Sequence, residues 1–419
     1  MNINTFETYR GLTNQFDIDT FRFLKQSSIY RILEEATQYS FSLINQHDQK
    51  IFNTKVLNQN NDVLIDSFST IYVNTEINKK QNDKCEIIHH LFLDKSYLHK
   101  EPQLIISKSH LINLFKENNN PNKNINLKNN IFSAYKGIVR KSDCDQMSHM
   151  NVQFYFDKHS AAIKNLFNCF SLFSKKDLDF KVENERCIFS KEVHLGFSLE
   201  IIFSIKSLKG NELILLSKVF CIDNQNISAF FETRITFELF DNFKKIIEDI
   251  FLLEKNTYLN ELNFEDLREL RGNRPKENFN KNAFISCKKA VNTWNIGFDG
   301  MSSSQFKIDC VSDAATHFFT ACGADYKWRT KYKIGSAALD YSVRYFKDAP
   351  LGMAITMYTN FTDIGNKSLK FIHHMIDDAS GDKIMDIEIV AVLFDLDKRV
   401  SIVVPDDFKK KAISLLIEN

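Results

Sequence analysis

The sequence predicts an α+β protein built from three successive units, each made of a strand, one long helix and an antiparallel meander. Two observations carry this prediction. The stretches YRGLTNQFDID, which starts at Tyr9, and YKGIVRKSDCD, which starts at Tyr135, align without gaps and share one Tyr, one Gly and two Asp. More faintly, Asp299-Gly-Met-Ser repeats Asp145-Gln-Met-Ser. Stretches that repeat along a chain in this way indicate tandem structural units.

A helix is expected after each of these stretches. Ser27 and Ser28 are of the type that caps a helix start and precede IYRILEEATQYSFSLI. The second helix is expected to run from about Asn151, and the third to end at Gly323, because glycine favours the position after a helix. β-like runs separated by turn signals follow, such as LEIIFSIKSL and NELILLSKVFCID. A long helix wrapped by a curved antiparallel sheet buries one face of each.

These patterns predict three domains, at residues 1–118, 131–252 and 285–419. Two stretches between them are expected to be connectors. Residues 116–130 are polar and rich in Asn, and residues 253–281 are highly charged.

Composition argues against several classes of protein. Lys and Arg number 54 against 53 Asp and Glu, so no nucleic-acid partner is expected. No apolar run reaches the roughly 18 residues of a membrane-spanning helix, and the first residues lack a signal-peptide pattern. Eight cysteines without a CxxC pair indicate reduced thiols, and hence a cytoplasmic protein.

No cofactor and no metal ion are expected. The phosphate-binding patterns GxGxxG and GxxxxGK[ST] are absent from the sequence. Two pairs of adjacent histidines occur, at 89–90 and 373–374. Adjacent residues of a strand point to opposite faces, so neither pair can hold one ion together.

The segment KSDCDQMSHMNVQFYFDKHSAA resembles the signature D-x-D-x-x-G-H-[MV]-N-N of hotdog-fold acyl thioesterases of the 4-hydroxybenzoyl-CoA type. Asp143, Asp145, His149, Met150 and Asn151 match it, whereas Ser148 replaces the usual Gly and Val152 the second Asn. The third unit resembles thioesterases linked with carnitine and betaine metabolism. In that unit the GHMN stretch is read as Ser302-Ser303-Ser304-Gln305. The first unit resembles part of an acyl-carrier-protein thioesterase, with Arg22-Phe23-Leu24-Lys25 at this place.

The resemblance implies three tandem hotdog units and hydrolysis of an acyl-CoA or acyl-carrier-protein thioester. Asp145 would act as nucleophile or general base, and Asn151 would hold the water or bind the thioester. His149 would orient Asp145 or help stabilise charge. Backbone N–H groups at the start of the following helix would hold the oxyanion. Asp299 is a second candidate carboxylate. Substrate contacts are expected from Ser148, Met150 and Tyr155.

Other interpretations remain open. An Asp before a helix is commonly a cap, which is the structural alternative for Asp145 and Asp299. The altered motifs of the first and third units would also fit a catalytically silent acyl-binding or scaffolding protein. A hydratase is disfavoured because its GDxNPxH loop is absent. Because hotdog units normally pair, a chain with three of them is expected to form a homodimer.

Overall fold

The computed structural model describes residues 4–43, 51–60, 63–66, 68–79, 84–94, 102–113, 133–174, 179–238 and 283–416. Both expected connectors, 116–130 and 253–281, lie outside these ranges.

The order of strand, helix and four strands occurs three times along the chain. The first segment contains β1 (Asn4–Leu12), α1 (Gln26–Leu43), β2 (Ile51–Gln59), β3 (Thr70–Lys79), β4 (Lys84–Leu93) and β5 (Gln103–Asn113). The second segment contains β6 (Ser133–Ile138), α2 (Val152–Ser174), β7 (Phe180–Phe189), β8 (Ser198–Lys209), β9 (Glu212–Cys221) and β10 (Asn226–Phe237). The third segment contains β11 (Phe284–Ala290), α4 (Ser304–Ala321), α5 (Tyr326–Tyr332), β12 (Ile334–Tyr345), β13 (Ala354–Ile364), β14 (Ser368–Asp377), β15 (Lys383–Asp395), β16 (Val400–Ser401) and α6 (Asp406–Ile413).

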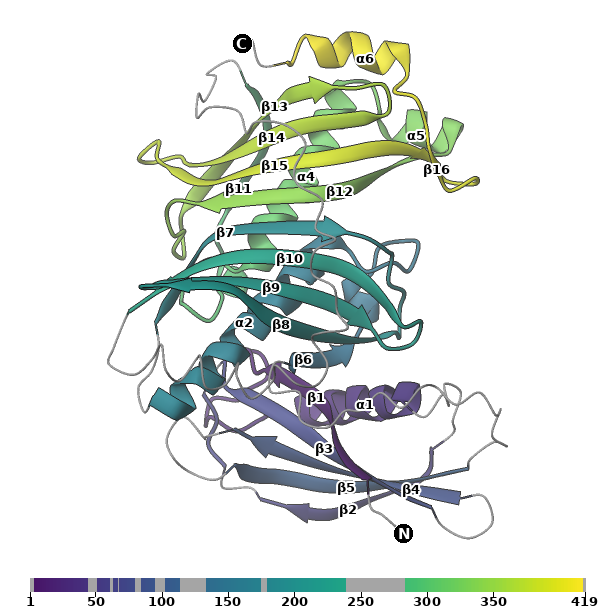
Figure 1. The fold of residues 1–419 in the computed structure, drawn as a ribbon, viewed down its shortest axis with the longest axis vertical. Coiled ribbons are helices and arrows are strands. Elements are labelled where there is room, and N and C mark those ends of the chain that lie inside the picture. The colour runs from purple at the N-terminus through teal and green to yellow at the C-terminus, as the bar shows by residue number, and fades with distance from the viewer. Residues whose placement is uncertain are drawn as a thin grey trace.

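All the strands that the structure describes belong to one sheet, and every pairing between them is antiparallel. The path through the sheet is β11-β13-β14-β15-β12-β7-β10-β9-β8-β6-β1-β3-β4-β5-β2, and β16 pairs with β15 beside it. The three segments therefore follow one another along the sheet, with the third at the top of Figure 1 and the first at the bottom. The α+β class and the antiparallel sheet are as predicted.

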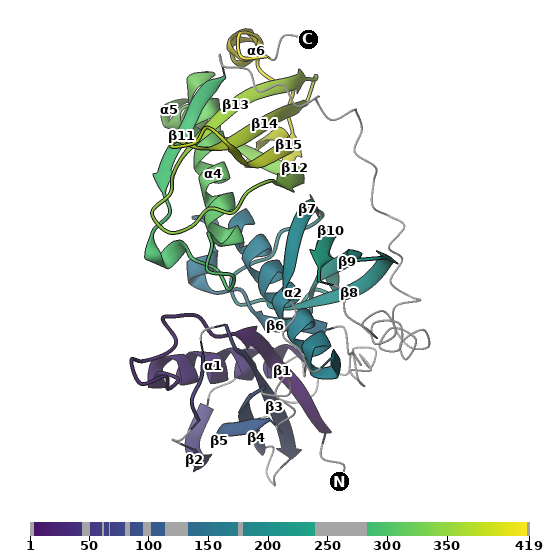
Figure 2. The ribbon, with the colours of Figure 1, turned by 90° about the vertical axis from the view of Figure 1, so that its left-hand side faces the viewer.

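Among the described residues, two strand pairings join the segments. β7 pairs with β12 between the second and third segments, and β1 pairs with β6 between the first and second. At the first of these junctions α2 also packs against α4, on one side of the strands (Figure 2). One hydrophobic core runs through the second and third segments, whereas the first segment has a separate core under α1.

The repeated Tyr-x-Gly of the sequence has a packing explanation. Tyr9 and Gly11 lie on one face of β1, and a Cβ atom on Gly11 would lie 2.6 Å from the Tyr9 hydroxyl oxygen. Tyr135 and Gly137 repeat this arrangement in β6, at 2.8 Å. The ring lies across the space that the glycine leaves empty, so a side chain at either glycine would displace it.

The helix boundaries differ from the prediction in the first segment. α1 already begins at Gln26, so Ser27 and Ser28 lie inside it and do not cap it. The Ser28 hydroxyl instead donates to Asp17 Oδ1 at 2.7 Å. The other two boundaries agree with the prediction. Asn151 precedes α2, its Oδ1 accepting from the Gln153 N–H at 3.2 Å, and Gly323, with φ +94°, follows α4.

Candidate functional site

The predicted motif forms a tight turn before α2, and the same turn occurs in all three segments. One backbone hydrogen bond closes it each time: Asp19 N–H to Phe23 O, Asp145 N–H to His149 O, and Gly297 N–H to Met301 O. The hydrogen bond in the third segment corrects the alignment of Asp299 with Asp145 that was made from sequence. Gly297 is the counterpart of Asp145, and Asp299 lies two residues further along the turn. The counterparts of residues 148–151 are accordingly residues 300–303, and not Ser302 to Gln305.

The unusual Ser148 occupies a left-handed backbone position. Its φ is 62°, and the counterparts Arg22 and Gly300 have φ values of 67° and 75°. Only glycine adopts this conformation without steric cost, which explains why a glycine is typical of the motif there. The third segment keeps the glycine, and the first two do not.

Asp145 lies exposed at the surface. Its Oδ1 accepts hydrogen bonds from the backbone N–H groups of Met147, at 2.8 Å, and His149, at 3.0 Å. The ring of His149 contacts other groups, with Nδ1 3.6 Å from Glu192 Oε1 and the ring centroid 4.6 Å from that of His194. In this arrangement Asp145 stabilises the turn.

The other predicted residues of the second segment have packing or capping roles. Met150 and Tyr155 are buried, and the Tyr155 ring lies edge-on to Phe189 with 5.3 Å between centroids. Asn151 caps α2 as described, and Ser148 lies in the turn. None of these residues lines the cavity that lies where the three segments meet.

A cavity of about 520 Å³ lies where the three segments meet. Its charged wall residues are Asp17 and Arg31 from the first segment, Arg140, Asp143, Asp157, Lys158 and Lys181 from the second, and Asp299, Lys307, Lys347 and Asp348 from the third. Gln15 Nε2 donates to Thr293 O at 2.7 Å, so the first and third segments touch directly beside it. Of the seven predicted site residues, Asp299 alone lines this cavity.

Asp157 of α2 contributes a carboxylate to the cavity wall. It lies on the face of α2 that also brings Phe154, Lys158 and Ala161 to the cavity. Among the residues that the structure describes, no hydrogen bond or ion pair reaches its carboxylate. Burial raises the pKa of Asp157, and the nearby Asp143 adds to this, against the opposing effect of Lys158. Groups with a perturbed pKa in a cavity are candidates for acid–base chemistry.

A buried ion pair lies next to Asp157. Lys158 Nζ is 2.7 Å from Asp143 Oδ2, and both side chains are almost inaccessible. Burial by itself would raise the pKa of Asp143, but the attraction of Lys158 and Arg140 outweighs it and lowers that pKa. Asp143 is therefore held as a carboxylate and Lys158 as an ammonium ion.

The third segment contributes the start of α4. Ser303 caps this helix by accepting from the Phe306 N–H, and Ser304 and Gln305 line the cavity in its first turn. Lys307 lines it too, although the residue is only 8% exposed. Burial lowers the pKa of Lys307 despite the nearby Asp299 and Asp348, and within the described structure its amine has no ion pair. The buried Ser302 hydroxyl also has no hydrogen-bond partner there. The helix start and the amine together favour negative charge at this wall.

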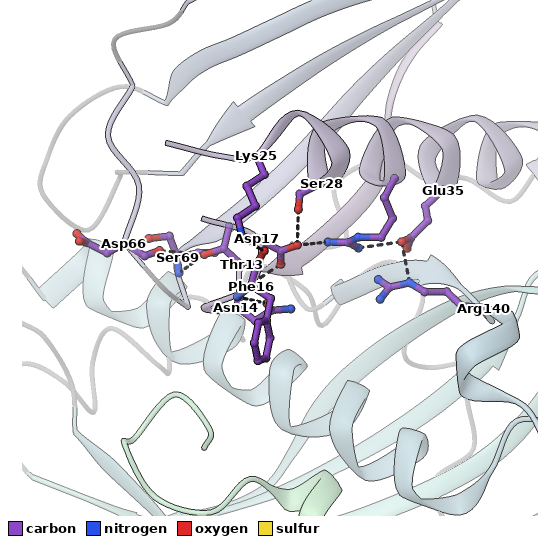
Figure 3. A network of polar contacts seen from close by, with 11 residues as sticks. Thr13, Asn14, Phe16, Asp17, Lys25, Ser28, Glu35, Asp66, Ser69 and Arg140 are labelled. Atoms are coloured by element: carbon purple, nitrogen blue, oxygen red, sulfur yellow. Dashed lines mark hydrogen bonds and ion pairs between the residues drawn. The ribbon is translucent and has the colours of Figure 1, made fainter. Parts of the chain in front are cut away.

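A polar network fixes the first segment against the second at the cavity edge (Figure 3). Glu35 of α1 accepts from Arg140 Nε at 2.8 Å and from Arg31 Nη1 at 3.0 Å. Arg31 in turn donates to Asp17 at 2.7 Å. The cavity wall is thus held in place by charges from both segments.

Within the described ranges, no group of three or more His, Cys, Asp or Glu is placed to hold a metal ion. His89 and His373 instead hydrogen-bond to threonines inside the sheet, Thr75 and Thr359. No helix of the described chain is long and apolar enough to cross a membrane.

Sequence reasoning missed Asp157 and Lys307. The signal for each is a charge within the otherwise apolar face of a helix, in FYFDKHSAA and SQFKIDC. Such a charge needs either a partner or a cavity. The sequence does not show which of the two it has, because the cavity is made by segments far apart along the chain.

The solved structures similar to this chain include a putative oleoyl thioesterase from Lactobacillus plantarum (10% identity, 62% of this chain and 96% of that chain covered, TM-score 0.48). They also include a 12:0-ACP thioesterase from Umbellularia californica (10% identity, 62% and 96% covered, TM-score 0.45). No curated protein matches the chain. Residues 298–412, most of the third segment, match the thioesterase-like superfamily.

Proposed function

We propose that the three segments are hotdog units and that the chain hydrolyses an acyl thioester in the cavity between them, with Asp157 as general base. The observation that carries this proposal is a carboxylate in the cavity wall with a raised pKa and, among the described residues, no hydrogen bond or ion pair. The superfamily match supports it, because residues 298–412 include Asp299 and Lys307 of the same cavity.

The wall residues suit the chemistry of this reaction. Water adds to the thioester carbonyl carbon, the C–S bond breaks, and a carboxylic acid and a thiol leave. Asp157 takes a proton from the attacking water and returns it to the departing thiolate. The first N–H groups of α4 and the ammonium of Lys307 stabilise the negative charge that develops on the carbonyl oxygen.

The substrate is an acyl-CoA or an acyl-carrier-protein thioester. Both carriers present the same thioester, and the charged wall favours an acyl group with polar character. The described cysteines are all free thiols, which supports a reducing compartment such as the cytoplasm.

The test is thiol release by the full-length protein from a panel of acyl-CoA and acyl-carrier-protein thioesters. Asp157→Asn should lower kcat about 10²- to 10⁴-fold, as expected for loss of a general base. The acid limb of the wild-type pH profile should lie above the range of an ordinary aspartate, because the base acts only when it is deprotonated.

Asp145→Asn is the matched control, since Asp145 is the base that the sequence motif suggests. It should keep kcat within a few-fold while lowering stability, because it weakens the turn. Loss of activity in Asp145→Asn, with Asp157→Asn active, would move the base to the turn and overturn the role of Asp157. An absence of turnover on every substrate, with acyl-CoA still bound, would favour the silent acyl-binding alternative.

A further inference from the structure

Two cysteines of the third segment lie against each other, and the proposed reaction uses neither. Cys287 belongs to β11 and Cys310 to α4, and both are free thiols. The two residues are buried, with 7% and 0% of their surfaces exposed. Their side chains share a hydrogen bond in which the Cys310 thiol donates to Cys287 Sγ. Two thiols that touch across separate elements have the proximity that a disulfide needs.

A β-bulge turns Cys287 towards the covered face of β11. The register between β11 and β13 shifts between Ile285 and Cys287, which leaves Ser286 as the extra residue. A bulge of this kind breaks the alternation of side chains between the two faces of a strand. Ser286 and Cys287 are accordingly both buried, whereas Ile285 is 51% exposed. The bulge therefore brings Cys287 to the face against which α4 packs.

Polar contacts on both sides of Cys287 fix β11 against α4. Lys289 Nζ lies 2.6 Å from Asp309 Oδ2 of the helix. Two turns further along the helix, His317 Nδ1 donates to the backbone oxygen of Ser286 at 2.7 Å. Cys287 lies between Ser286 and Lys289 along the strand, so its position relative to the helix is set from both directions.

The surroundings make Cys287 the more acidic thiol of the pair. The hydrogen bond from Cys310 lowers the pKa of Cys287, and the Lys289 ammonium adds to this, against the opposing effect of burial. The pKa of Cys310 is raised, because its proton is held by Cys287 and because burial disfavours a charge there. The thiolate is the reactive form of cysteine. Cys287 is therefore the nucleophile, and Cys310 is the second thiol.

We propose that Cys287 and Cys310 form a redox site that hydrogen peroxide converts reversibly to a disulfide. The Cys287 sulfur attacks one peroxide oxygen and the O–O bond breaks, which leaves a sulfenic acid on Cys287 and releases the other oxygen as water. The Cys310 sulfur then displaces the hydroxyl group from Cys287 and forms the S–S bond, with loss of a second water. The two sulfurs lose two electrons, the peroxide gains them, and both thiol protons end in water. This inference does not depend on the proposed catalytic activity.

Burial limits which oxidants can reach this site. Exchange with a disulfide requires that its sulfur approaches the thiolate, so the rate depends on access. Cys287 is only 7% exposed. Hydrogen peroxide is small and uncharged, whereas glutathione disulfide is a bulky, charged peptide. The site should therefore respond to peroxide and much less to glutathione disulfide.

The test is oxidation of the reduced full-length protein by hydrogen peroxide, followed by blocking of free thiols and peptide mass mapping. In wild type, the peptides that contain Cys287 and Cys310 should become linked, with the loss of two hydrogen atoms. Dithiothreitol should restore both thiols. Glutathione disulfide at the same concentration should form this link at least about 10-fold more slowly.

Three substitutions separate the roles of the cysteines. Cys310→Ser should leave Cys287 as a sulfenic acid, which dimedone traps, because the second thiol is missing. Cys287→Ser should slow the oxidation of Cys310 at least about 10-fold, because the nucleophile is missing. Cys322→Ser is the matched control. Cys322 is a buried cysteine of the same segment, where burial raises the pKa of the thiol to about 12, and this variant should form the link at the wild-type rate.

Two results would overturn the proposal. One is a wild-type protein that keeps Cys287 and Cys310 reduced in peroxide, and the other is a protein that links either of them to a different cysteine. Equal rates with peroxide and glutathione disulfide would overturn the assignment of peroxide as the oxidant.

Discussion

Lys158 Nζ lies 2.7 Å from Asp143 Oδ2, and this ion pair is almost completely buried at the edge of the cavity. Removing Lys158 leaves the buried carboxylate of Asp143 without its ion-pair partner. We therefore expect Lys158→Met to lower the free energy of unfolding by about 3–5 kcal/mol, measured by urea denaturation.

An exposed pair provides the control for this prediction. Lys206 and Glu232 are 2.6 Å apart, but their side chains are 51% and 36% exposed. Lys206→Met should change stability by less than about 1 kcal/mol. Equal effects of the two substitutions would contradict the importance of burial for the Asp143–Lys158 pair.

The junction of the first and second segments depends on Glu35. Its Oε1 accepts from both Arg140 and Arg31. We expect Glu35→Gln to destabilise the protein by about 2 kcal/mol, less than Lys158→Met because both arginines remain partly solvated. Thermal denaturation measures this, with Glu34→Gln on the exposed side of α1 as control. A Tm loss in Glu34→Gln as large as in Glu35→Gln would argue against the network.

Two buried histidines should make stability depend on pH. Burial lowers the pKa of His373 to about 3, and it lowers that of His89 well below its usual value. The unfolded chain takes up protons near pH 6.5, whereas the folded chain does not. Each histidine therefore stabilises the fold fully above about pH 6.5, and this contribution falls by up to about 1.4 kcal/mol per pH unit as the pH drops from 6.5 towards 3. His373→Asn should have a shallower stability–pH curve than wild type in this window, and parallel curves would contradict the prediction.

The left-handed turn position gives a matched pair of substitutions. Ser148 has φ 62° and Gly300 has φ 75°, and a Cβ atom on Gly300 would meet nothing within 4 Å. Gly300→Ala should thus cost about 1 kcal/mol from backbone conformation alone, and Ser148→Gly should stabilise by up to about 1 kcal/mol. Chemical denaturation of both variants checks the signs. A stabilising Gly300→Ala would show that this backbone conformation is not strained.

The turns and caps at the helix ends could be predicted from sequence because they are local, whereas of the cavity wall only Asp299 was among the predicted site residues. The turn around Asp145, the cap at Asn151 and the left-handed glycine after α4 depend on residues within a few positions of one another. The third-segment alignment failed for a related reason. Asp299 and Asp145 are both followed by Met and Ser at the same spacing. The backbone hydrogen bond that defines the turn nevertheless places Gly297 at the position of Asp145. Identity of residue type did not reveal which N–H closes the turn.

The sequence by itself determined the α+β class, the antiparallel strands and the order of elements, since these follow from periodicity and from residues near each other along the chain. Only the tertiary structure decided which charged side chains lie around the same cavity. Asp157, Lys307 and Asp17 come from three segments and meet at one cavity, while Asp145 stays at the surface. Burial and long-range pairing set the pKa values and the exposed edges, and neither is encoded in the spacing of the residues.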